Sequence, residues 1–262
     1  MKDITKIIVP FDTSTTTERA LDYAINFAGD DQSIEILLTH ISDVSEDISI
    51  YNILDERIAQ IKKDNPYFRG TLNSVIKSGD LVENILEAQK EFQADLVIMG
   101  TKGAEDESAA TNTSRLTLEA DFPVIAIPEN TKEFGVKKIA LILGQKEIED
   151  AAVLGTLLDV ARRFQAQVHV LTICNEDGCY GYTPADEKNE NAIEYYLENF
   201  YSHHTFQENT DIEKGVFEYI KDKEIDLLAI LPRNHAKKNG PSEGRLTKLL
   251  TLHTEIPLLT ID

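Results

Sequence analysis

Glycine and hydroxyl residues follow one predicted strand in a pattern that could bind phosphate. The segment Met99-Gly100-Thr101-Lys102-Gly103 comes directly after an apolar run, and Thr111-Asn112-Thr113-Ser114 lies a short distance beyond it. Glycine lets the backbone turn sharply and bring its N–H groups close to a phosphate. Hydroxyls at the N-terminus of a following helix can complete such an anion site. A G-x-x-G pattern by itself is weak, because most such glycines only form turns.

Polar side chains after two other strands are expected at the same edge. Asp12 ends the first predicted strand, where its carboxylate could accept hydrogen bonds from a ribose. His40 ends the second strand and either lines the pocket or packs at the edge. In doubly wound sheets, ligands bind beyond the carboxyl ends of the strands, at the switch point between the first and fourth. The candidate binding residues are Pro10, Asp12, His40, Ile41, Met99, Gly100, Gly103, Thr111, Thr113 and Ser114.

The elements that position these residues alternate between strands and helices. β-Branched and apolar runs predict strands at 4–10, 34–40, 72–76, 95–99 and 123–127. Apolar residues at helical spacing predict helices after the capping residues 13–15, at 50–61, at 81–92 and near 115–119. This alternation predicts βαβ units, and hence an α/β fold with a doubly wound parallel sheet covered by helices on both faces.

The second half of the sequence repeats the first at an almost constant offset. Four segments recur in order, between 131 and 134 residues later: Lys6–Val9 as Lys138–Leu141, Leu37–Thr39 as Val170–Thr172, Ala94–Ile98 as Ile225–Ala229, and Pro123–Ile125 as Pro257–Leu259. We therefore predict two tandem domains with five strands each, at residues 1–132 and 133–262, joined by a linker at 129–134. About 130 residues is a common size for an independent domain.

Composition limits the classes of partner. The chain has 262 residues and a formal net charge of −20, which argues against a nucleic-acid or anionic-membrane surface.

Cys174 and Cys179 are too few for a disulfide framework, so we expect free thiols in a reducing compartment. A zinc site that also uses His203 and His204 is the alternative. With no signal peptide or membrane-length apolar run in the sequence, we expect a cytoplasmic protein.

The motifs of the first half resemble the universal stress protein family. The segments that carry the resemblance are Val9-Pro10-Phe11-Asp12-Thr13-Ser14, Ser78-Gly79-Asp80, Ala94 to Gly103, and Pro123-Val124-Ile125. The resemblance covers the whole first half and, more weakly, the second. It implies a Rossmann-like fold of the adenine nucleotide alpha hydrolase type. It also implies that the last strands of two domains pair about a two-fold axis, here within one chain.

The resemblance also implies a nucleotide site, in a degraded form. Family members that bind ATP have G-x2-G-x9-G-(S/T) after the fourth strand and Asp at the end of the first. Asp12, Gly100 and Gly103 match this pattern, but the third glycine is replaced by Thr113 or, in an alignment with a shorter loop, by Ala110. The acidic run 105–107 would repel a triphosphate unless a metal intervened. The expected cofactor is ATP, with Mg²⁺ if it binds.

The second half departs further from the pattern. Gly144 stands where the first half has Asp12, Leu231 where it has Gly100, and Pro232 removes a backbone donor. We expect this domain to be degenerate, with a divergent pocket. A basic cluster either binds another anionic ligand or an acidic partner, or is a solvated loop; its members are Arg233, His235, Lys237, Lys238, Arg245 and Lys248.

These features favour a stress-response binding and regulatory module over an enzyme. The sequence shows no Ser-His-Asp order, metal-ligand motif or lysine P-loop, so nothing in it indicates catalysis. One alternative is slow ATP hydrolysis or phosphate transfer, with Lys102 or Arg115 near the phosphates. The other is a ligand-free scaffold for protein partners. We expect the two domains to form an intramolecular pseudo-dimer, with further homodimerisation left open.

Overall fold

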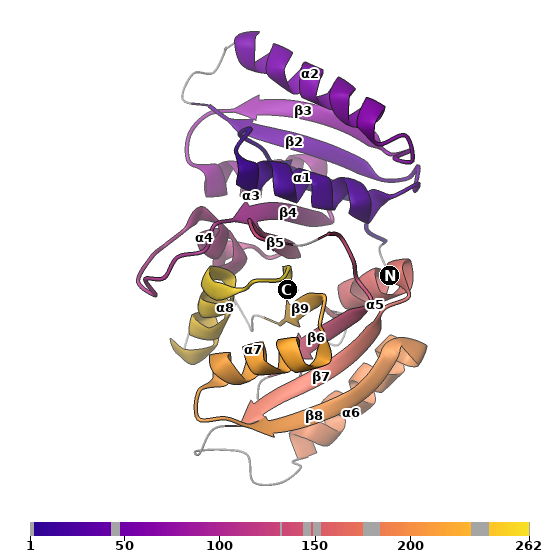
Figure 1. Ribbon diagram of the computed structural model, residues 1–262, viewed down its shortest axis with the longest axis vertical. Helices are drawn as coiled ribbons and strands as arrows, with labels where there is room; N and C mark the ends of the chain where they lie inside the picture. The colour runs from indigo at the N-terminus through magenta and orange to yellow at the C-terminus, as the bar shows by residue number, and fades with distance from the viewer. Residues whose placement is uncertain are drawn as a thin grey trace.

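All ten strands of the computed structural model lie in one sheet. The structure describes residues 3–42, 48–131, 133–143, 148, 153–174, 184–231 and 241–261. The strand order is β3-β2-β1-β4-β5-β10-β9-β6-β7-β8. Figure 1 shows the first half of the chain (β1–β5) above the second half (β6–β10), with the sheet running through both. Within each half, every paired strand is parallel to its neighbour.

The first half has the predicted alternation. Its strands are β1 (Lys6–Pro10), β2 (Glu35–Ile41), β3 (Thr71–Lys77), β4 (Leu96–Thr101) and β5 (Val124–Pro128). Its helices are α1 (Thr15–Ala28), α2 (Ile48–Asp64), α3 (Leu81–Phe92) and α4 (Asn112–Glu119). The order β3-β2-β1-β4-β5 is that of a doubly wound sheet. The fold predicted from the sequence is therefore confirmed; α4 begins earlier than expected, because Thr111 caps it.

The second half repeats the order of the first. Its strands are β6 (Lys138–Ile142), β7 (Gln167–Cys174), β8 (Tyr201–Glu208), β9 (Leu227–Ile230) and β10 (Leu258–Thr260). Its helices are α5 (Leu154–Phe164), α6 (Pro184–Leu197), α7 (Ile212–Lys223) and α8 (Pro241–His253), with a 3₁₀ turn at Glu198–Phe200. The arrangement β8-β7-β6-β9-β10 reproduces β3-β2-β1-β4-β5. The repeat seen in the sequence is thus a repeat of structure.

Local sequence explains where several helices start. Ser14, Asp80, Thr111 and Asp211 each accept a hydrogen bond from the backbone N–H three residues later, which supplies a partner that the first turn of a helix lacks. Each such cap stabilises a helix by about 1 kcal/mol. The predicted cap in the region 13–15 is therefore Ser14.

The halves join through an antiparallel strand pair. β10 pairs with β5, and Leu259 is the register partner of Ile125. Both side chains are completely buried. The expected pairing of the last strands within one chain is confirmed, and this pseudo-dimer contains no free sheet edge at the junction.

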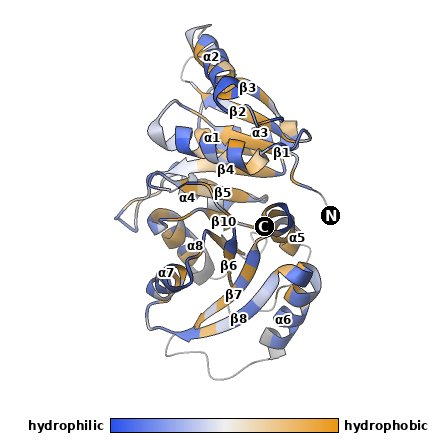
Figure 2. Cartoon of the chain, turned by 45° about the vertical axis from the view of Figure 1, so that its right-hand side comes forward, coloured by the Kyte–Doolittle hydropathy of each residue, from blue (hydrophilic) through white to orange (hydrophobic). Residues whose placement is uncertain are grey.

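One face of the sheet carries a core that both halves share. Buried residues of α1 and α5 belong to the same apolar cluster, whereas α3 with α4 and α7 with α8 cover separate clusters on the other face. Four aromatic rings join the halves in series with centroid separations of 4.8, 5.3 and 5.2 Å: Tyr23, Phe134, Phe164 and Phe27. Figure 2 shows the apolar strands at the centre of the molecule and more polar helices around them. Among the described helices, none is long and apolar enough to cross a membrane.

Candidate functional site

The predicted binding edge is formed where β1 lies between β2 and β4. Pro10 at the end of β1 pairs with Thr39 of β2, and Ile8 of β1 pairs with Val97 of β4. The chain leaves β1 toward α1 and leaves β4 toward α4, so the two connections depart from adjacent strands. This is the topological switch point at which doubly wound sheets bind ligands. Of the candidate residues that frame it, Pro10, Met99 and Gly100 are buried, whereas Ile41 is only partly buried.

Asp12 is exposed and lies in the turn that leads into α1. Its Oδ1 atom accepts hydrogen bonds from the Ser14 N–H (2.9 Å) and the Thr17 hydroxyl (2.8 Å). Burial by itself would raise the pKa of Asp12, but the hydrogen bonds from Ser14 and Thr17 hold it below its ordinary value. The backbone of Thr13 has φ = 67°, a left-handed conformation that is uncommon for a β-branched residue. Asp12 is therefore a fixed carboxylate at the predicted position.

His40 is partly buried beside this turn. Its Nδ1 atom lies 2.8 Å from the carbonyl oxygen of Phe11. Because a carbonyl only accepts hydrogen bonds, Nδ1 must carry the hydrogen, and the Nε2 atom of neutral His40 is then an acceptor. The ring is close enough to Asp12 that, when it is protonated, its charge lowers the pKa of this carboxylate. The structure thus brings Asp12 and His40 together, as the sequence predicted.

Gly100 has a packing role. A Cβ atom at this position would collide with the backbone carbonyl of Thr16, in the first turn of α1. The absence of a side chain therefore lets α1 pack directly on the end of β4. The G-x-x-G pattern indicated a close approach correctly, but here the approaching group is protein backbone.

The hydroxyls before and within α4 hold this helix against β4. Thr111 caps the helix by accepting the Ser114 N–H at 3.1 Å, and the Ser114 hydroxyl donates to the Thr111 carbonyl. The Thr113 hydroxyl is buried and donates to the carbonyl of Gly100 at 2.9 Å. Thr113 stands in one alignment where the family has its third glycine. Its hydroxyl fixes the start of α4 relative to the end of β4.

Gly103 contacts the second half of the chain. Its backbone has φ = 68°, and a Cβ atom would collide with the carbonyl oxygen of Leu252 in α8. The same carbonyl accepts a hydrogen bond from the Ala104 N–H at 3.2 Å. Sequence reasoning missed Leu252, because no local pattern indicates which helix of a second domain packs on a loop.

Arg115 is paired with a neighbouring helix cap. Its guanidinium donates to both carboxylate oxygens of Asp80, at 2.9 and 3.2 Å. This pairing lowers the pKa of Asp80 and joins the N-terminus of α3 to α4. Lys102 and the acidic residues 105–107 lie in the loop between β4 and α4, where Glu107 contacts Arg245 of α8 at 3.3 Å.

Much of the equivalent edge in the second half lies outside the described residues. Gly144 and residues 232–240, which hold four members of the basic cluster, are in this group. Arg245 and Lys248 are described and belong to α8.

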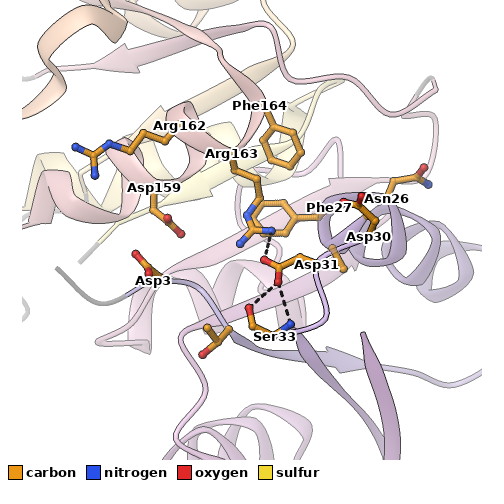
Figure 3. Close-up of a pocket in the computed structure, with 13 residues that line it drawn as sticks. Asp3, Asn26, Phe27, Asp30, Asp31, Ser33, Asp159, Arg162, Arg163 and Phe164 are labelled. Carbon is orange, nitrogen blue, oxygen red and sulfur yellow. Dashed lines mark hydrogen bonds and ion pairs between the residues drawn. The ribbon is translucent and has the colours of Figure 1, made fainter. Parts of the chain in front are cut away.

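Two cavities lie beside α1, and neither was predicted from the sequence. One, of about 560 Å³, lies between the start of the chain, the loop after α1 and the end of α5. Figure 3 shows Arg163 of α5 reaching Asp31, which also accepts hydrogen bonds from Ser33; the Arg163–Asp31 separation is 3.0 Å. The other, of about 530 Å³, is lined by residues of α1, Asn65 and the linker. No sequence signal predicts them, because their walls come from distant segments.

Two side predictions concern cysteine and histidine. Cys174 is disulfide-bonded, so the expectation of a free thiol there is wrong, and Cys179 lies outside the described residues. His203 and His204 lie in β8, where the His203 ring contacts the His169 ring in a tilted arrangement, with a centroid separation of 4.6 Å. In the described part of the chain, no group of three or more His, Cys, Asp or Glu side chains could hold a metal ion.

Strand order, junction and switch-point loops define a tandem pair of Rossmann-like domains. Residues 3–128 match the model of the universal stress protein family. A universal stress protein from Archaeoglobus fulgidus covers 98% of this chain and 96% of its own, with 12% identity and a TM-score of 0.71. A functionally unknown protein from Pseudomonas aeruginosa covers 98% of this chain and 92% of its own, with 13% identity and a TM-score of 0.61. Comparison with curated proteins gave no match.

Residues 3–128 therefore form a domain of the universal stress protein family. The family model covers the first half, and the likeness in fold extends through both halves.

Proposed function

We propose that this chain is a stress-response binding and regulatory module whose first half binds an adenine nucleotide. The observation that carries the proposal is the position of Asp12 after β1 and of His40 near the end of β2, beside the switch point between β1 and β4. Doubly wound sheets bind ligands at this point for reasons of topology, and residues 3–128 match a family in which some members bind ATP, which agrees with an adenine nucleotide as the ligand.

Each of these residues has a defined role in the proposal. The Asp12 carboxylate is ionised and held in place by Ser14 and Thr17, so that it can accept hydrogen bonds from ribose hydroxyls. The Nε2 atom of His40 can accept a hydrogen bond at the same edge when the ring is neutral. The N-terminus of α4 carries a partial positive charge, which favours phosphate.

The electrostatics of the loop between β4 and α4 predict modest affinity. Glu105, Asp106 and Glu107 place three carboxylates in this loop, and an ordinary polyphosphate would be repelled by them. Mg²⁺ bound to the phosphates would reduce this repulsion, so we expect ATP to bind as its magnesium complex. We expect a Kd on the order of 10 µM to 1 mM.

Binding without turnover is favoured over the enzymatic alternative. Arg115, one of the two cations considered for contact with phosphates, is already paired with both oxygens of Asp80. Transfer or hydrolysis of a phosphoryl group depends on positioned cations that stabilise charge in the transition state. Slow ATP hydrolysis or phosphate transfer is the first alternative function, and a ligand-free scaffold for protein partners is the second.

The remaining features of the proposal follow from the tandem fold. We place the domain boundary at residues 132/133, with a degenerate nucleotide edge and a divergent pocket in the second domain. We further propose a cytoplasmic location and protein partners that respond to the nucleotide state. Homodimerisation of the two-domain chain would use surfaces other than the β5–β10 junction, which is already occupied.

Isothermal titration of the nucleotide-stripped protein with ATP–Mg²⁺ tests the proposal. Asp12→Asn should weaken binding at least tenfold. Asp55→Asn, which removes the same charge from an exposed position on α2, should leave the Kd unchanged. Release of phosphate during prolonged incubation would favour the enzymatic alternative. No heat and no thermal stabilisation at millimolar ATP–Mg²⁺ would contradict nucleotide binding and leave the scaffold.

A further inference from the structure

Helix α8 of the second half lies against the proposed phosphate loop of the first half. In Figure 1, α8 is beside α4 and the loop that leads into it. The Leu252 carbonyl, in the last turn of α8, accepts the Ala104 N–H at 3.2 Å, and Gly103 has no room for a Cβ atom against it. Carbonyls in the last turn of a helix have no partner within that helix. Ala104 therefore supplies a partner to the end of α8.

Two further contacts hold α8 in this position. Arg245 lies near the N-terminus of α8, and its guanidinium is 3.3 Å from the carboxylate of Glu107 in the loop. The hydroxyl groups of Thr251 and Thr117 lie 3.3 Å apart and are buried between α8 and α4. The loop between β4 and α4 is thus contacted by α8 at Gly103 and Ala104 and again at Glu107, and the helix that follows the loop is contacted as well.

One of these contacts uses a backbone donor that a phosphate would need. The Gly103 N–H donates to the Thr101 hydroxyl at 3.1 Å, and the Ala104 N–H donates to Leu252. A phosphate bound by this loop would be held by such N–H groups. The C-terminus of α8 also carries a partial negative charge, which disfavours an anion beside it. The contact between α8 and the loop therefore opposes phosphate binding in two ways.

We infer that α8 is an autoinhibitory element, in which the Leu252 carbonyl competes with a nucleotide phosphate for the Ala104 N–H. The inference rests on the proposed function and deepens it, because it names the element that regulates the site. Displacement of α8 from the loop frees the donor and moves the helix C-terminus away. Nucleotide affinity in the first half is thus set by the position of a helix in the second.

A variant that loosens α8 tests this inference in the full chain. Arg245→Ala combined with Thr251→Val removes the contacts with Glu107 and Thr117. The control is Arg162→Ala, which removes another exposed ion pair, with Glu198. We expect the double variant to bind ATP–Mg²⁺ about three- to tenfold more tightly, as loss of one competing hydrogen bond predicts. Hydrogen exchange at the Ala104 amide should become faster, and the control should change neither quantity.

The outcomes separate this inference from the proposed function. If the wild-type protein binds ATP–Mg²⁺ and the double variant binds with equal or lower affinity, the autoinhibitory role is wrong and the nucleotide site stands. If neither the wild-type protein nor the double variant binds ATP–Mg²⁺, the proposed nucleotide site and the autoinhibitory role are both wrong. If only the double variant binds ATP–Mg²⁺, the result supports both the nucleotide site and the autoinhibitory role. Should the double variant fail to fold, Gly103→Ala pushes the loop away from Leu252 directly; unchanged exchange at Ala104 and unchanged affinity would then overturn the inference.

Discussion

The hydroxyl groups of Thr117 and Thr251 lie 3.3 Å apart, and the two residues are separated by 134 positions in the sequence. Ile125 and Leu259, the central register partners of β5 and β10, have the same separation. Both pairs join equivalent residues of the two halves, so a pseudo-two-fold axis passes through the α4–α8 contact and the strand junction. The helix that follows the switch-point loop of the first half, α4, therefore packs against the equivalent helix of the second half, α8.

The shared core predicts that Phe164 stabilises both halves. Phe164→Ala removes edge contacts with Phe27 and Phe134 and should lower the free energy of unfolding by about 2–3 kcal/mol. Tyr195→Ala, at a side chain that is 79% exposed, should change it by less than about 0.5 kcal/mol. Urea denaturation measures both. Two separate transitions, with only one shifted in Phe164→Ala, would show that the halves do not share a core.

Gly100 is predicted to be required for packing. Gly100→Ala places a methyl group against the Thr16 carbonyl and should cost about 3 kcal/mol of stability. Gly135→Ala is the matched control, because a Cβ there meets no atom within 4 Å. Thermal denaturation compares the two variants. Equal stability in both would mean that α1 does not approach β4 as closely as described.

His169 should make stability depend on pH. Burial, followed by the nearby His203, Lys138 and Lys223, lowers the pKa of His169 below 6.5, and Tyr219 of α7 contacts its ring. The unfolded chain then binds more protons than the folded one below about pH 6.5, so this contribution is complete above that pH and is lost as the pH falls toward the folded pKa.

The corresponding measurement is the free energy of unfolding between pH 7.5 and pH 5. His169→Gln should flatten its decrease on acidification. His253→Gln, which removes a histidine that lies 2.5 Å from Glu213 instead, serves as the comparison. An identical slope in wild-type protein and His169→Gln would refute the assignment to His169.

Arg115 is predicted to contribute little to nucleotide binding. Its ion pair with Asp80 is exposed to solvent, which screens the attraction, so the pair contributes little to stability. Arg115→Ala should therefore leave the Kd for ATP–Mg²⁺ within about twofold and lower stability slightly. Calorimetric titration of this variant provides the check. A tenfold loss of affinity would instead place the guanidinium on the phosphates and favour the phosphate-transfer alternative.

The sequence predicted local elements well and contacts between the halves less well. Continuous apolar runs predicted every strand of the first half. A strand such as Leu96–Thr101 is buried on both faces, so nearly all of its residues are apolar. The placement of Asp12 and His40 at one edge was predictable because the carboxyl ends of parallel strands meet there. The contacts of Gly100 with Thr16 and of Gly103 with Leu252 could not be predicted from the sequence. A glycine indicates that another group packs closely against the backbone, but it does not indicate which residue provides that group.

Chemical-shift mapping by NMR is the decisive test of nucleotide binding at the switch point, because it reports where a nucleotide binds as well as whether it binds. ¹H–¹⁵N spectra would be recorded during titration with ATP–Mg²⁺. We predict that the largest changes fall on residues 11–17, 40–41 and 100–104 and on the first turn of α4, with smaller changes at the end of α8. Changes confined to the cavities beside Arg163 or Tyr23, or no changes at millimolar nucleotide, would contradict it.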